Sequence, residues 1–410
     1  MSKKRRNNII FLLTQDLESP SGIGRYFPLS KNLVQEGYSV TIAALHSDFD
    51  SLKKHTIWQE GVKVAYVAQM HVKKEDHKTQ YFRSHELIWH TLKATWNLFR
   101  FVLRNPADII VIGKPHPMNS IAGLLGGWLS GSKIILDCDD YEAESNFFSA
   151  NWQKGIIRIF ENFTPKLVHQ ITTNTLFNKN RMIDIGISPK KIYYLPNGVD
   201  AERFSGIDLE EAKQIAAELG LEHQKVIAYI GSLSLANHPV NLLLESIKLI
   251  VDQETNVTSL IVGGGKDLKT LKNLARELQI EDKVVFIGRV APDAVPYFYQ
   301  IADVTVDPVF ETDAAKGRCP LKMFESWIME TPFVTADVGD RKFLAGNPPS
   351  ALLAKPGSSE DLALQLSRVL SNPRLAEELI FQGKQNIRNY LWHNLANDLC
   401  KILDNLLNKR

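Results

Sequence analysis

The sequence predicts an α/β protein with two doubly wound domains, each a parallel sheet covered by helices on both faces. Short apolar runs of strand length alternate with helical patterns along the chain, as expected where helical crossovers join parallel strands. The alternation occurs twice, with a break at 195–204, where turn residues interrupt both periodicities. A chain of 410 residues is also too long for one ordinary hydrophobic core, which indicates more than one domain. A cleft between two such domains is the default ligand site.

The expected strands are short runs rich in Ile, Val and Leu. In the first half they are 9–13, 39–44, 62–67, 108–112, 133–137, 170–173 and 191–195, and in the second half 226–230, 258–262, 283–287, 304–306, 333–335 and 351–353. Among the helices between them, 209–219 carries Ala212, Ile215, Ala216 and Leu219 at the spacing of one helix face.

The segment 85–104 is rich in aromatic and basic residues and predicts an amphipathic helix. We expect its apolar stripe to be buried against the first sheet. The stripe consists of Ile88, Leu92, Trp96, Phe99 and Leu103. A helix that lies on a membrane surface or contacts a lipid acceptor is the alternative.

The composition is that of a globular protein, with 44% hydrophobic and 23% charged residues. A net charge of +2 gives no indication of nucleic-acid binding. The three cysteines are far apart and fit a reducing cytoplasm. No apolar run approaches the roughly 18 residues that span a bilayer. The basic residues 3–6 precede a first strand rather than a cleavage site; contact with anionic lipid at the inner face of the membrane and a solvated tail both fit them.

The most informative segment is 307–340. Here a strand ends in an acidic loop, and Pro320 then begins a helix with Lys322 and Glu325 on one face. Open α/β sheets bind ligands beyond the carboxyl ends of their strands, and a helix start offers free N–H groups to an anion. We infer a sugar nucleotide, with phosphate near Lys322 and ribose hydroxyls near Glu325. A solvated Lys–Glu pair on a surface helix is the alternative.

Glycines follow two of the expected strands. Gly22 and Gly24 let the backbone approach a ligand closely, but a dinucleotide fingerprint needs a third glycine where Phe27 stands, which argues against NAD. Contact with an anion or sugar and a mere tight turn both fit. At glycines 263–265 a strand-to-helix turn is favoured over an anion nest.

A group of polar residues follows two strands of the first half. Asp137, Asp139 and Asp140 end one strand and are expected to face the cleft. They fit sugar hydroxyl binding, a general base, a metal site or a helix cap. Lys114 and His116 follow another strand at the same sheet edge, where a binding role and a structural role fit equally.

Several segments resemble, in their order and spacing, the retaining GT-B glycosyltransferases of family 4, also called group 1. They are 195–200, 229–246, 261–271, 283–290 and 320–339. The resemblance implies two Rossmann-like domains that face each other across a cleft. Residues 1–198 would bind the acceptor, residues 199–388 the nucleotide sugar, and a C-terminal helix within 389–410 would cross back to the first domain.

The resemblance implies transfer from a nucleotide-diphosphate sugar to a glycan, a lipid-linked or a small-molecule hydroxyl acceptor, in polysaccharide or glycolipid assembly. No cofactor and no metal are expected. The expected donor-binding residues are Gly22, Gly24, Ser232, His238, Arg289, Val290, Arg318, Leu321, Lys322 and Glu325. Acceptor contacts are expected from Lys114, His116, Asp137 and Asp140, and catalytic roles from Asp139, Lys322 and Glu311.

The chain departs from the family pattern at the diphosphate site. Ser232 and His238 stand where the family has Arg and Lys to neutralise the leaving diphosphate. Lys322, Arg318 or Arg289 would have to compensate. A sugar-nucleotide-binding partner without catalytic activity is therefore an alternative, as is a GT-B epimerase or phosphorylase.

Two further positions also depart from the pattern. Asp139 stands where the family has a histidine near the transferred sugar. The family has two glutamates that are separated by seven residues. If Glu325 is the second, the first would fall at Gly317. Either Glu311 or Asp313 on the preceding loop takes the role of that first glutamate, or this chain lacks the role.

Overall fold

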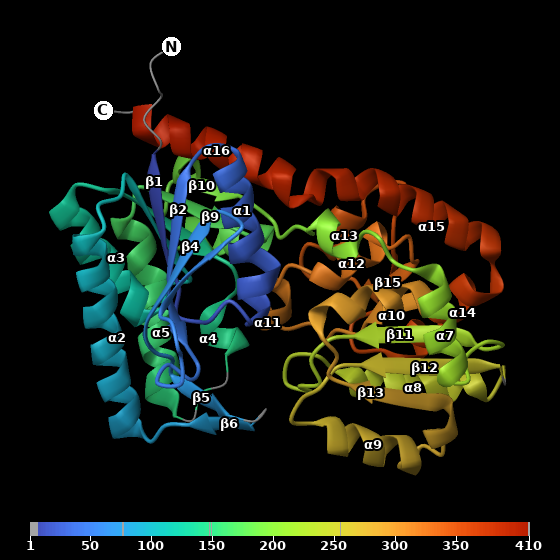
Figure 1. Ribbon diagram of the computed structural model, residues 1–410. Coiled ribbons are helices and arrows are strands. Elements are labelled where there is room, and N and C mark those ends of the chain that lie inside the picture. The colour runs from blue at the N-terminus through green and yellow to red at the C-terminus, as the bar shows by residue number, and fades with distance from the viewer. Residues whose placement is uncertain (1–6, 76–77, 147, 149, 255, 409–410) are drawn as a thin grey trace. The chain divides into compact units, whose positions relative to one another are not determined.

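The structure is a computed structural model that describes residues 7–75, 78–146, 148, 150–254 and 256–408 (Figure 1). Residue contacts divide it into two units. The first comprises Met1–Gly198, Gly317–Cys319 and Trp392–Arg410, and the second comprises Val199–Lys316 and Pro320–Leu391. The expected membrane contact of residues 3–6 lies outside the described residues. The assignment of acceptor and donor binding to separate domains stays a prediction.

The first unit contains an eight-stranded sheet that is parallel except where β3 pairs with β4 at one edge. Because the chain moves outward from β1 in one direction and then in the other, the topological switch point lies between β1 and β7. In sheet order the strands are β10 (Ile192–Tyr194), β9 (Gln170–Thr173), β8 (Lys133–Cys138), β7 (Ile109–Gly113), β1 (Asn8–Leu12), β2 (Ser39–His46), β4 (Val62–Gln69) and β3 (Thr56–Gln59).

Strand β1 shows why this sheet is covered on both faces. Ile9 and Phe11 lie in one buried cluster, and Ile10 and Leu12 lie in another. A strand that is apolar at every position suits a parallel sheet between two layers of helices. The larger helices of the first unit are α1 (Phe27–Gln35), α2 (Ser84–Arg104), α3 (Pro117–Ser130), α5 (Asn151–Leu167), α6 (Leu176–Asp184) and α16 (Trp392–Asn408).

Helix α16 belongs to the core of the first unit although it ends the described chain. Its buried side chains recur with helical spacing and lie in the same cluster as Ile9 and Phe11. These side chains are Trp392, Leu395, Ala396, Leu399, Ile402, Leu403 and Leu406. The helix packs against α1 on this face of the sheet.

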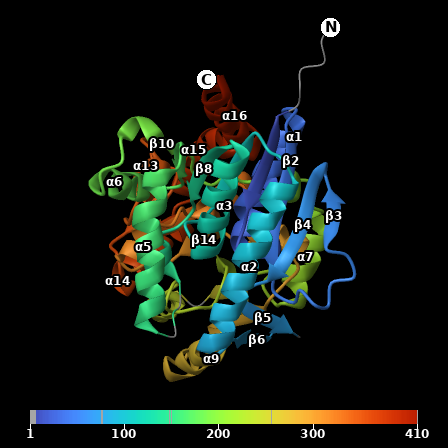
Figure 2. The ribbon, with the colours of Figure 1, turned by 90° about the vertical axis from the view of Figure 1, so that its left-hand side faces the viewer.

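The helix expected at 85–104 is present as α2, but the prediction that its large apolar stripe is buried is wrong. Ile88, Leu92, Trp96 and Leu103 are 49%, 61%, 56% and 44% exposed, and Phe99 is half-buried. The buried side chains are Ala94, Leu98 and Val102. They form a narrow face, which packs against α3 (Figure 2).

The small size of the contacting residues explains this orientation. A Cβ atom at Gly126 of α3 would lie 2.7 Å from Cγ1 of Val102, so the two helices approach closely only because Gly126 has no side chain. The larger side chains of α2 are left on its outer face.

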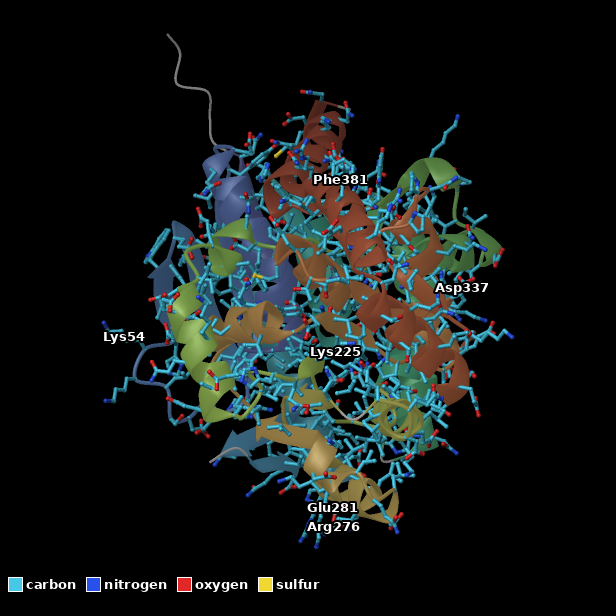
Figure 3. All side chains as sticks on the ribbon, turned by 90° about the vertical axis from the view of Figure 1, so that its right-hand side faces the viewer. Lys54, Lys225, Arg276, Glu281, Asp337 and Phe381 are labelled. Atoms are coloured by element: carbon cyan, nitrogen blue, oxygen red, sulfur yellow. The ribbon has the colours of Figure 1, made fainter. Side chains whose placement is uncertain are left out.

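The second unit repeats the topology with six parallel strands. In sheet order these are β13 (Val284–Gly288), β12 (Val257–Val262), β11 (Lys225–Ile230), β14 (Val304–Asp307), β15 (Phe333–Ala336) and β16 (Leu352–Ala354). The switch point lies between β11 and β14. The helices include α7 (Leu209–Glu218), α8 (Val240–Val251), α9 (Leu268–Glu277), α10 (Val295–Ile301), α12 (Leu321–Ile328), α13 (Arg341–Ala345), α14 (Ser359–Ser371) and α15 (Pro373–Asn386). Figure 3 shows the side chains, among them the exposed Arg276 on α9 and Phe381 on α15.

The predicted strands are confirmed, each with ends within two residues of the expected ones. The sequence did not predict β3 or the small antiparallel pair β5 (Val72–Glu75) and β6 (Lys78–Tyr81). Strand β3 is largely exposed and β5 is rich in charge, so neither has an apolar run to mark it. Among the described residues, no helix combines the length and apolarity required to cross a bilayer.

Candidate active site

Lys114 occupies the switch point of the first sheet, directly after β7. Its backbone has a positive φ of 68°, a conformation that most residues avoid. The backbone N–H of Lys114 donates to the Asp137 carbonyl at 2.9 Å, which ties this turn to the end of β8. The side chain is nearly buried and lies among carboxylates.

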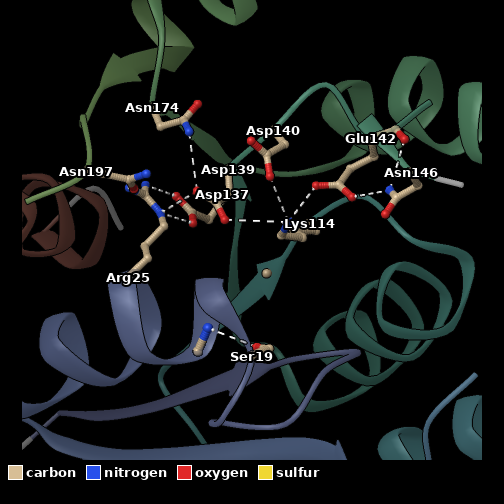
Figure 4. A network of polar contacts seen from close by, with 12 residues as sticks. Ser19, Arg25, Lys114, Asp137, Asp139, Asp140, Glu142, Asn146, Asn174 and Asn197 are labelled. Carbon is tan, nitrogen blue, oxygen red and sulfur yellow. Dashed lines mark hydrogen bonds and ion pairs between the residues drawn. The ribbon is translucent and has the colours of Figure 1, made fainter. Parts of the chain in front are cut away.

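Three carboxylates surround the Lys114 ammonium group (Figure 4). Its Nζ lies 2.9 Å from Glu142 Oε1, 3.2 Å from Asp140 Oδ2 and 3.5 Å from Asp139 Oδ2. The other oxygen of Glu142 contacts His116 Nε2 at 3.0 Å. The structure therefore brings Lys114, His116, Asp139 and Asp140 together, as the sequence predicted for residues at one sheet edge.

Asp137 has a different environment from its neighbours. Arg25 donates to its two oxygens at 2.8 and 2.6 Å, and the Thr172 hydroxyl donates at 2.6 Å. Arg25 also donates to Asn197 Oδ1 at 2.8 Å and to the Leu195 carbonyl at 3.2 Å. The expectation that Asp137 faces a cleft and binds acceptor is therefore corrected. The residue is 2% exposed, and both of its oxygens are occupied by contacts that include Arg25.

The cluster carries more negative than positive charge. Arg25 and Lys114 face four carboxylates, those of Asp137, Asp139, Asp140 and Glu142. Burial raises the pKa of Asp140 to about 6, assisted by its acidic neighbours and opposed by Lys114. Burial also opposes charge on Glu142, but Lys114 and His116 outweigh it and lower the pKa of Glu142.

The interpretation of the acidic run as a helix cap loses support in this geometry. The N-cap of the short helix α4 (Glu142–Ser145) is Tyr141, and Glu161 of α5 caps it by accepting the Glu142 N–H at 2.7 Å. Within the described ranges, no group of three His, Cys, Asp or Glu side chains is placed to hold a metal ion. The acids instead contact basic and amide side chains.

Gly22 and Gly24 lie in a helical turn rather than in a flexible loop. Residues Gly22–Tyr26 form a π-helical turn that continues into α1. A Cβ atom at Gly22 would lie 2.6 Å from the Asp16 carbonyl oxygen, so the chain itself requires glycine there. Arg25 follows in the same turn, which places its guanidinium against Asp137.

In the second unit, the switch point is occupied by an ion triad. Asp307 ends β14, and its two oxygens contact Lys322 Nζ at 3.0 Å and Arg341 Nη2 at 3.1 Å. Lys322 also lies over the Tyr229 ring, 5.1 Å from its centroid. Burial alone would raise the pKa of Asp307, but Lys322, Arg341 and His238 outweigh it and lower that pKa. The triad therefore retains one net positive charge.

Lys322 and Glu325 lie on α12, as predicted, although Pro320 is its N-cap rather than its first helical residue. The Tyr299 hydroxyl donates to Glu325 Oε2 at 2.7 Å, and Arg203 Nη1 lies 3.8 Å from Oε1. The Glu325 side chain is still 18% exposed. Tyr299 thus orients a carboxylate that retains access to solvent.

The glycines after β12 mark a close approach of two loops. Gly263 has a φ of +143°, and a Cβ atom there would collide with the Gly231 carbonyl. Gly265 meets the Leu233 carbonyl in the same way. The favoured interpretation as a strand-to-helix turn agrees with this packing. Ser232 and Arg289 are exposed on these loops, whereas His238 and Val290 are half-buried.

The structure of the loop before α12 does not identify which residue takes the role of the first glutamate of the family pattern. Glu311 and Asp313 are 62% and 61% exposed, and both contact Lys316, at 3.1 and 3.9 Å. Arg318 lies in the short stretch that groups with the first unit, where its charge lowers the pKa of Asp140. The roles predicted for Glu311 and Arg318 stay predictions.

Sequence reasoning missed the side chains that hold the predicted ones in place. They are Arg25, Glu142, Asn174, Asn197, Tyr299, Asp307 and Arg341. A usable signal exists for Asp307, because it is the last residue of a buried strand at a switch point. Arg341 and Asn197 contact partners that are distant in sequence, which no local pattern reveals.

Comparison with known proteins covers both units. Residues 21–203 match the model of glycosyltransferase family 4, and residues 211–386 match that of glycosyl transferases group 1. The chain is 26% identical over 230 residues to mannosylfructose-phosphate synthase of Agrobacterium fabrum, which covers 54% of this chain and 49% of that protein. The chain thus spans about half the length of the curated relatives that it matches in this way.

Solved structures match over nearly the whole chain. Sucrose-phosphate synthase of Thermosynechococcus elongatus has a TM-score of 0.78 at 15% identity, covering 99% of this chain and 100% of that one. Anabaena HepE in complex with UDP-glucose has a TM-score of 0.73 at 15% identity, covering 97% and 99%. These likenesses show the GT-B fold.

Proposed function

Because the chain belongs to the group 1, family 4 glycosyltransferases of GT-B fold, we propose that it transfers a hexose from a nucleotide-diphosphate sugar to an acceptor hydroxyl, with retention of configuration. Polysaccharide or glycolipid assembly at the cytoplasmic side of a membrane is the proposed setting. Support for this donor class comes from HepE, whose structure holds UDP-glucose.

The observation that carries the proposal is the Asp307–Lys322–Arg341 triad beside the first turn of α12. Asp307 fixes Lys322 at 3.0 Å, and the triad keeps one net positive charge. The first backbone N–H groups of α12 add a positive dipole end. A fixed positive site of this kind stabilises charge on a leaving diphosphate without reorganising during the reaction. Lys322 and the N–H groups of Leu321 and Lys322 are the proposed diphosphate contacts.

Glu325 is the proposed ribose ligand. Tyr299 occupies one side of its carboxylate by donating at 2.7 Å. The remaining acceptor capacity suits two vicinal hydroxyl groups, each of which is a hydrogen-bond donor. Ser232, Arg289 and Val290 are proposed to contact the donor from neighbouring loops.

The acceptor hydroxyl is proposed to bind at Lys114, His116 and Asp140. In the reaction, the bond from the acceptor oxygen to the anomeric carbon forms while the bond from that carbon to the phosphate oxygen breaks. The acceptor proton passes to the leaving phosphate on the same face. Asp139, held by Lys114 and Asn174, would stabilise positive charge on the sugar ring. The protein's contribution is then mainly orientation and electrostatics.

The test is a thermal-shift screen with UDP, GDP, ADP and dTDP and their sugars, followed by transfer assays. A ligand at one hundred times its Kd stabilises the folded state by about 2.7 kcal/mol. We expect one nucleotide series to raise Tm, and the product's anomeric configuration, read by NMR, to match that of the donor. An inverted product would contradict the retaining mechanism, and no shift at millimolar ligand would contradict the donor class.

A catalytically inactive sugar-nucleotide-binding partner is the second candidate. Ser232 and His238 replace two family cations, and Lys322 is itself paired with Asp307. Such a protein would bind nucleotide but neither transfer nor hydrolyse the donor. An epimerase would convert the donor without acceptor, and a phosphorylase would respond to inorganic phosphate.

A further inference from the structure

The first unit exposes a large apolar surface on three neighbouring helices, which we call the apolar helical face. Helix α3 lies between α2 and α5 on one side of the sheet (Figure 2). The face consists of Ile88, Trp89, Leu92, Trp96 and Leu103 on α2, Ile121, Leu125, Trp128 and Leu129 on α3, and Trp152, Ile156, Ile159, Phe163 and Leu167 on α5.

This concentration is not a general property of the surface. Of the 21 large apolar side chains that are exposed in the described part of the chain, 14 belong to these three helices. On each helix they recur at spacings of three, four or seven residues, which lie on one face of a helix, so each helix presents an apolar stripe to solvent. Exposed apolar patches of such extent on soluble proteins usually mark a site of association.

The charges around the face distinguish between possible occupants. Helices α2 and α5 carry six basic residues, and α3 has no charged residue. Of the two acids on these helices, Glu86 is exposed and Glu161 is fully buried. Glu144, just before α5, pairs with two of the basic residues, Lys154 and Arg158. An excess of positive charge therefore surrounds the apolar stripes.

A second copy of the chain fits this face poorly. In a twofold dimer the same patch meets itself, so basic residues of one copy would approach those of the other. An anionic bilayer has the complementary charge. Four of the chain's seven tryptophans lie on the face, and tryptophan and basic residues together are typical of helices that lie at the lipid–water interface.

We propose that the apolar helical face docks the first unit onto the surface of a bilayer containing anionic lipid. Trp89, Trp96, Trp128 and Trp152 enter the interfacial layer, and Lys93, Arg100 and Lys166 meet lipid phosphates.

Two of these helices, α3 and α5, adjoin the acceptor cluster, which consists of Lys114, His116 and Asp140, the residues proposed to bind the acceptor. Helix α3 begins one residue after His116, and Glu161 of α5 accepts the backbone N–H of Glu142 at 2.7 Å. The docked helices would therefore fix the acceptor cluster relative to the membrane. Docking itself rests on the surface alone and stands if the proposed reaction is wrong.

Binding of the full chain to vesicles tests the proposal. We expect co-sedimentation with phosphatidylcholine–phosphatidylglycerol vesicles, weaker binding to pure phosphatidylcholine, and quenching of tryptophan fluorescence by brominated lipid. Each basic residue near an anionic leaflet contributes roughly a fivefold change in partitioning. The combined Lys93→Glu, Arg100→Glu and Lys166→Glu variant should therefore bind about a hundredfold more weakly. We expect a loss of at least about tenfold for Trp89→Ser with Trp96→Ser and Trp128→Ser.

Matched controls come from exposed residues outside the face. Trp58→Ser and Phe381→Ser remove aromatics that are 71% and 58% exposed, and Lys401→Glu reverses a lysine that is 73% exposed. These variants should bind as the parent does, and circular dichroism should be unchanged in all. Equal loss in the controls, undiminished binding of both face variants, or no binding by the parent chain would each overturn the proposal. Self-association of the parent that both face variants abolish would assign the face to a second copy instead.

Discussion

Replacing Arg25 by methionine should destabilise the first unit more than any loss of an exposed charge. Methionine keeps an unbranched side chain of similar reach but removes the cation. Arg25 is 1% exposed and donates to both oxygens of Asp137, which is 2% exposed. The Arg25→Met variant therefore leaves a buried carboxylate that still accepts from the Thr172 hydroxyl at 2.6 Å but has lost its cation.

The magnitude follows from the loss of one partner of a buried pair. Such a loss typically costs about 3–5 kcal/mol, because the other charge stays buried without compensation. Carbonyl oxygens of Leu195 and Pro196 also lose donors. Removing both charges, in Arg25→Met with Asp137→Asn, should be less costly than Arg25→Met alone, since no uncompensated charge remains.

The pH dependence provides an independent check. Burial opposes the charged form of Asp137, but Arg25 outweighs it and lowers the pKa of Asp137. In the parent chain this contribution is present above the unfolded pKa of about 3.9 and is lost as pH falls through the lower folded value. Without Arg25 the buried acid should instead have a raised pKa. The destabilisation by Arg25→Met should then be smaller at pH 5 than at pH 8.

Hydrogen exchange of peptides from β1 and β8 in increasing urea measures the first unit separately, which matters because a two-unit chain need not unfold in one step. Lys401→Ala on α16 is the control, since it removes an exposed pair with Asp398 and should cost less than about 0.5 kcal/mol. A change below about 1 kcal/mol for Arg25→Met would refute the reasoning. So would a double variant less stable than Arg25→Met alone.

The remaining predictions concern the proposed donor and acceptor sites. Lys322→Ala should lower kcat by about a hundredfold or more, because a fixed cation is lost from the developing diphosphate charge; steady-state kinetics at saturating donor measures this. Glu325→Ala should weaken nucleoside diphosphate binding in calorimetry, and Tyr299→Phe should weaken it less, because the carboxylate loses its orientation but stays in place. Asp140→Asn should stabilise the protein at pH 7 by up to about 3 kcal/mol, because burial raises the pKa of Asp140 from its usual value to about 6, so that its charge opposes folding. This gain should fall to about 0.5 kcal/mol near pH 4, where the folded acid is protonated and the unfolded acid is about half protonated.

Each of these predictions has an outcome that contradicts it. An unchanged rate would remove Lys322 from the mechanism. Equal affinity for nucleotide in the Glu325→Ala variant would exclude the ribose contact. A stability gain for Asp140→Asn that does not diminish between pH 7 and pH 4 would mean that packing, rather than charge, distinguishes the two side chains.

Strand positions were predictable because the residues of each predicted strand form a short apolar run in the sequence. The run Ile9–Leu13 is apolar at five consecutive positions and is followed by polar residues, which is typical of a short strand buried on both faces. The direction in which α2 faces was not predictable in this way. Its periodicity shows that one face differs from the other, but Gly126 on a different helix decides which face is buried.

In the candidate site, some residues were likewise predictable from local sequence and others were not. Lys114, Asp140 and Lys322 were found because they follow strands or begin a helix, and those positions can be read from the sequence. Their partners were not. Arg25 reaches Asn197 across 172 residues of sequence and Arg341 reaches Asp307 across 34, so only the folded chain shows these pairs.

Helix α16 affects how the protein is made. Its buried side chains, among them Trp392, Leu399 and Leu403, complete a core whose members outside α16 all lie before residue 196. During synthesis, one face of the sheet formed by residues before 196 therefore stays incompletely covered until roughly two hundred further residues have been added. A fragment ending near residue 198 should therefore aggregate when expressed alone, and adding residues 392–408 as a separate peptide should rescue its solubility.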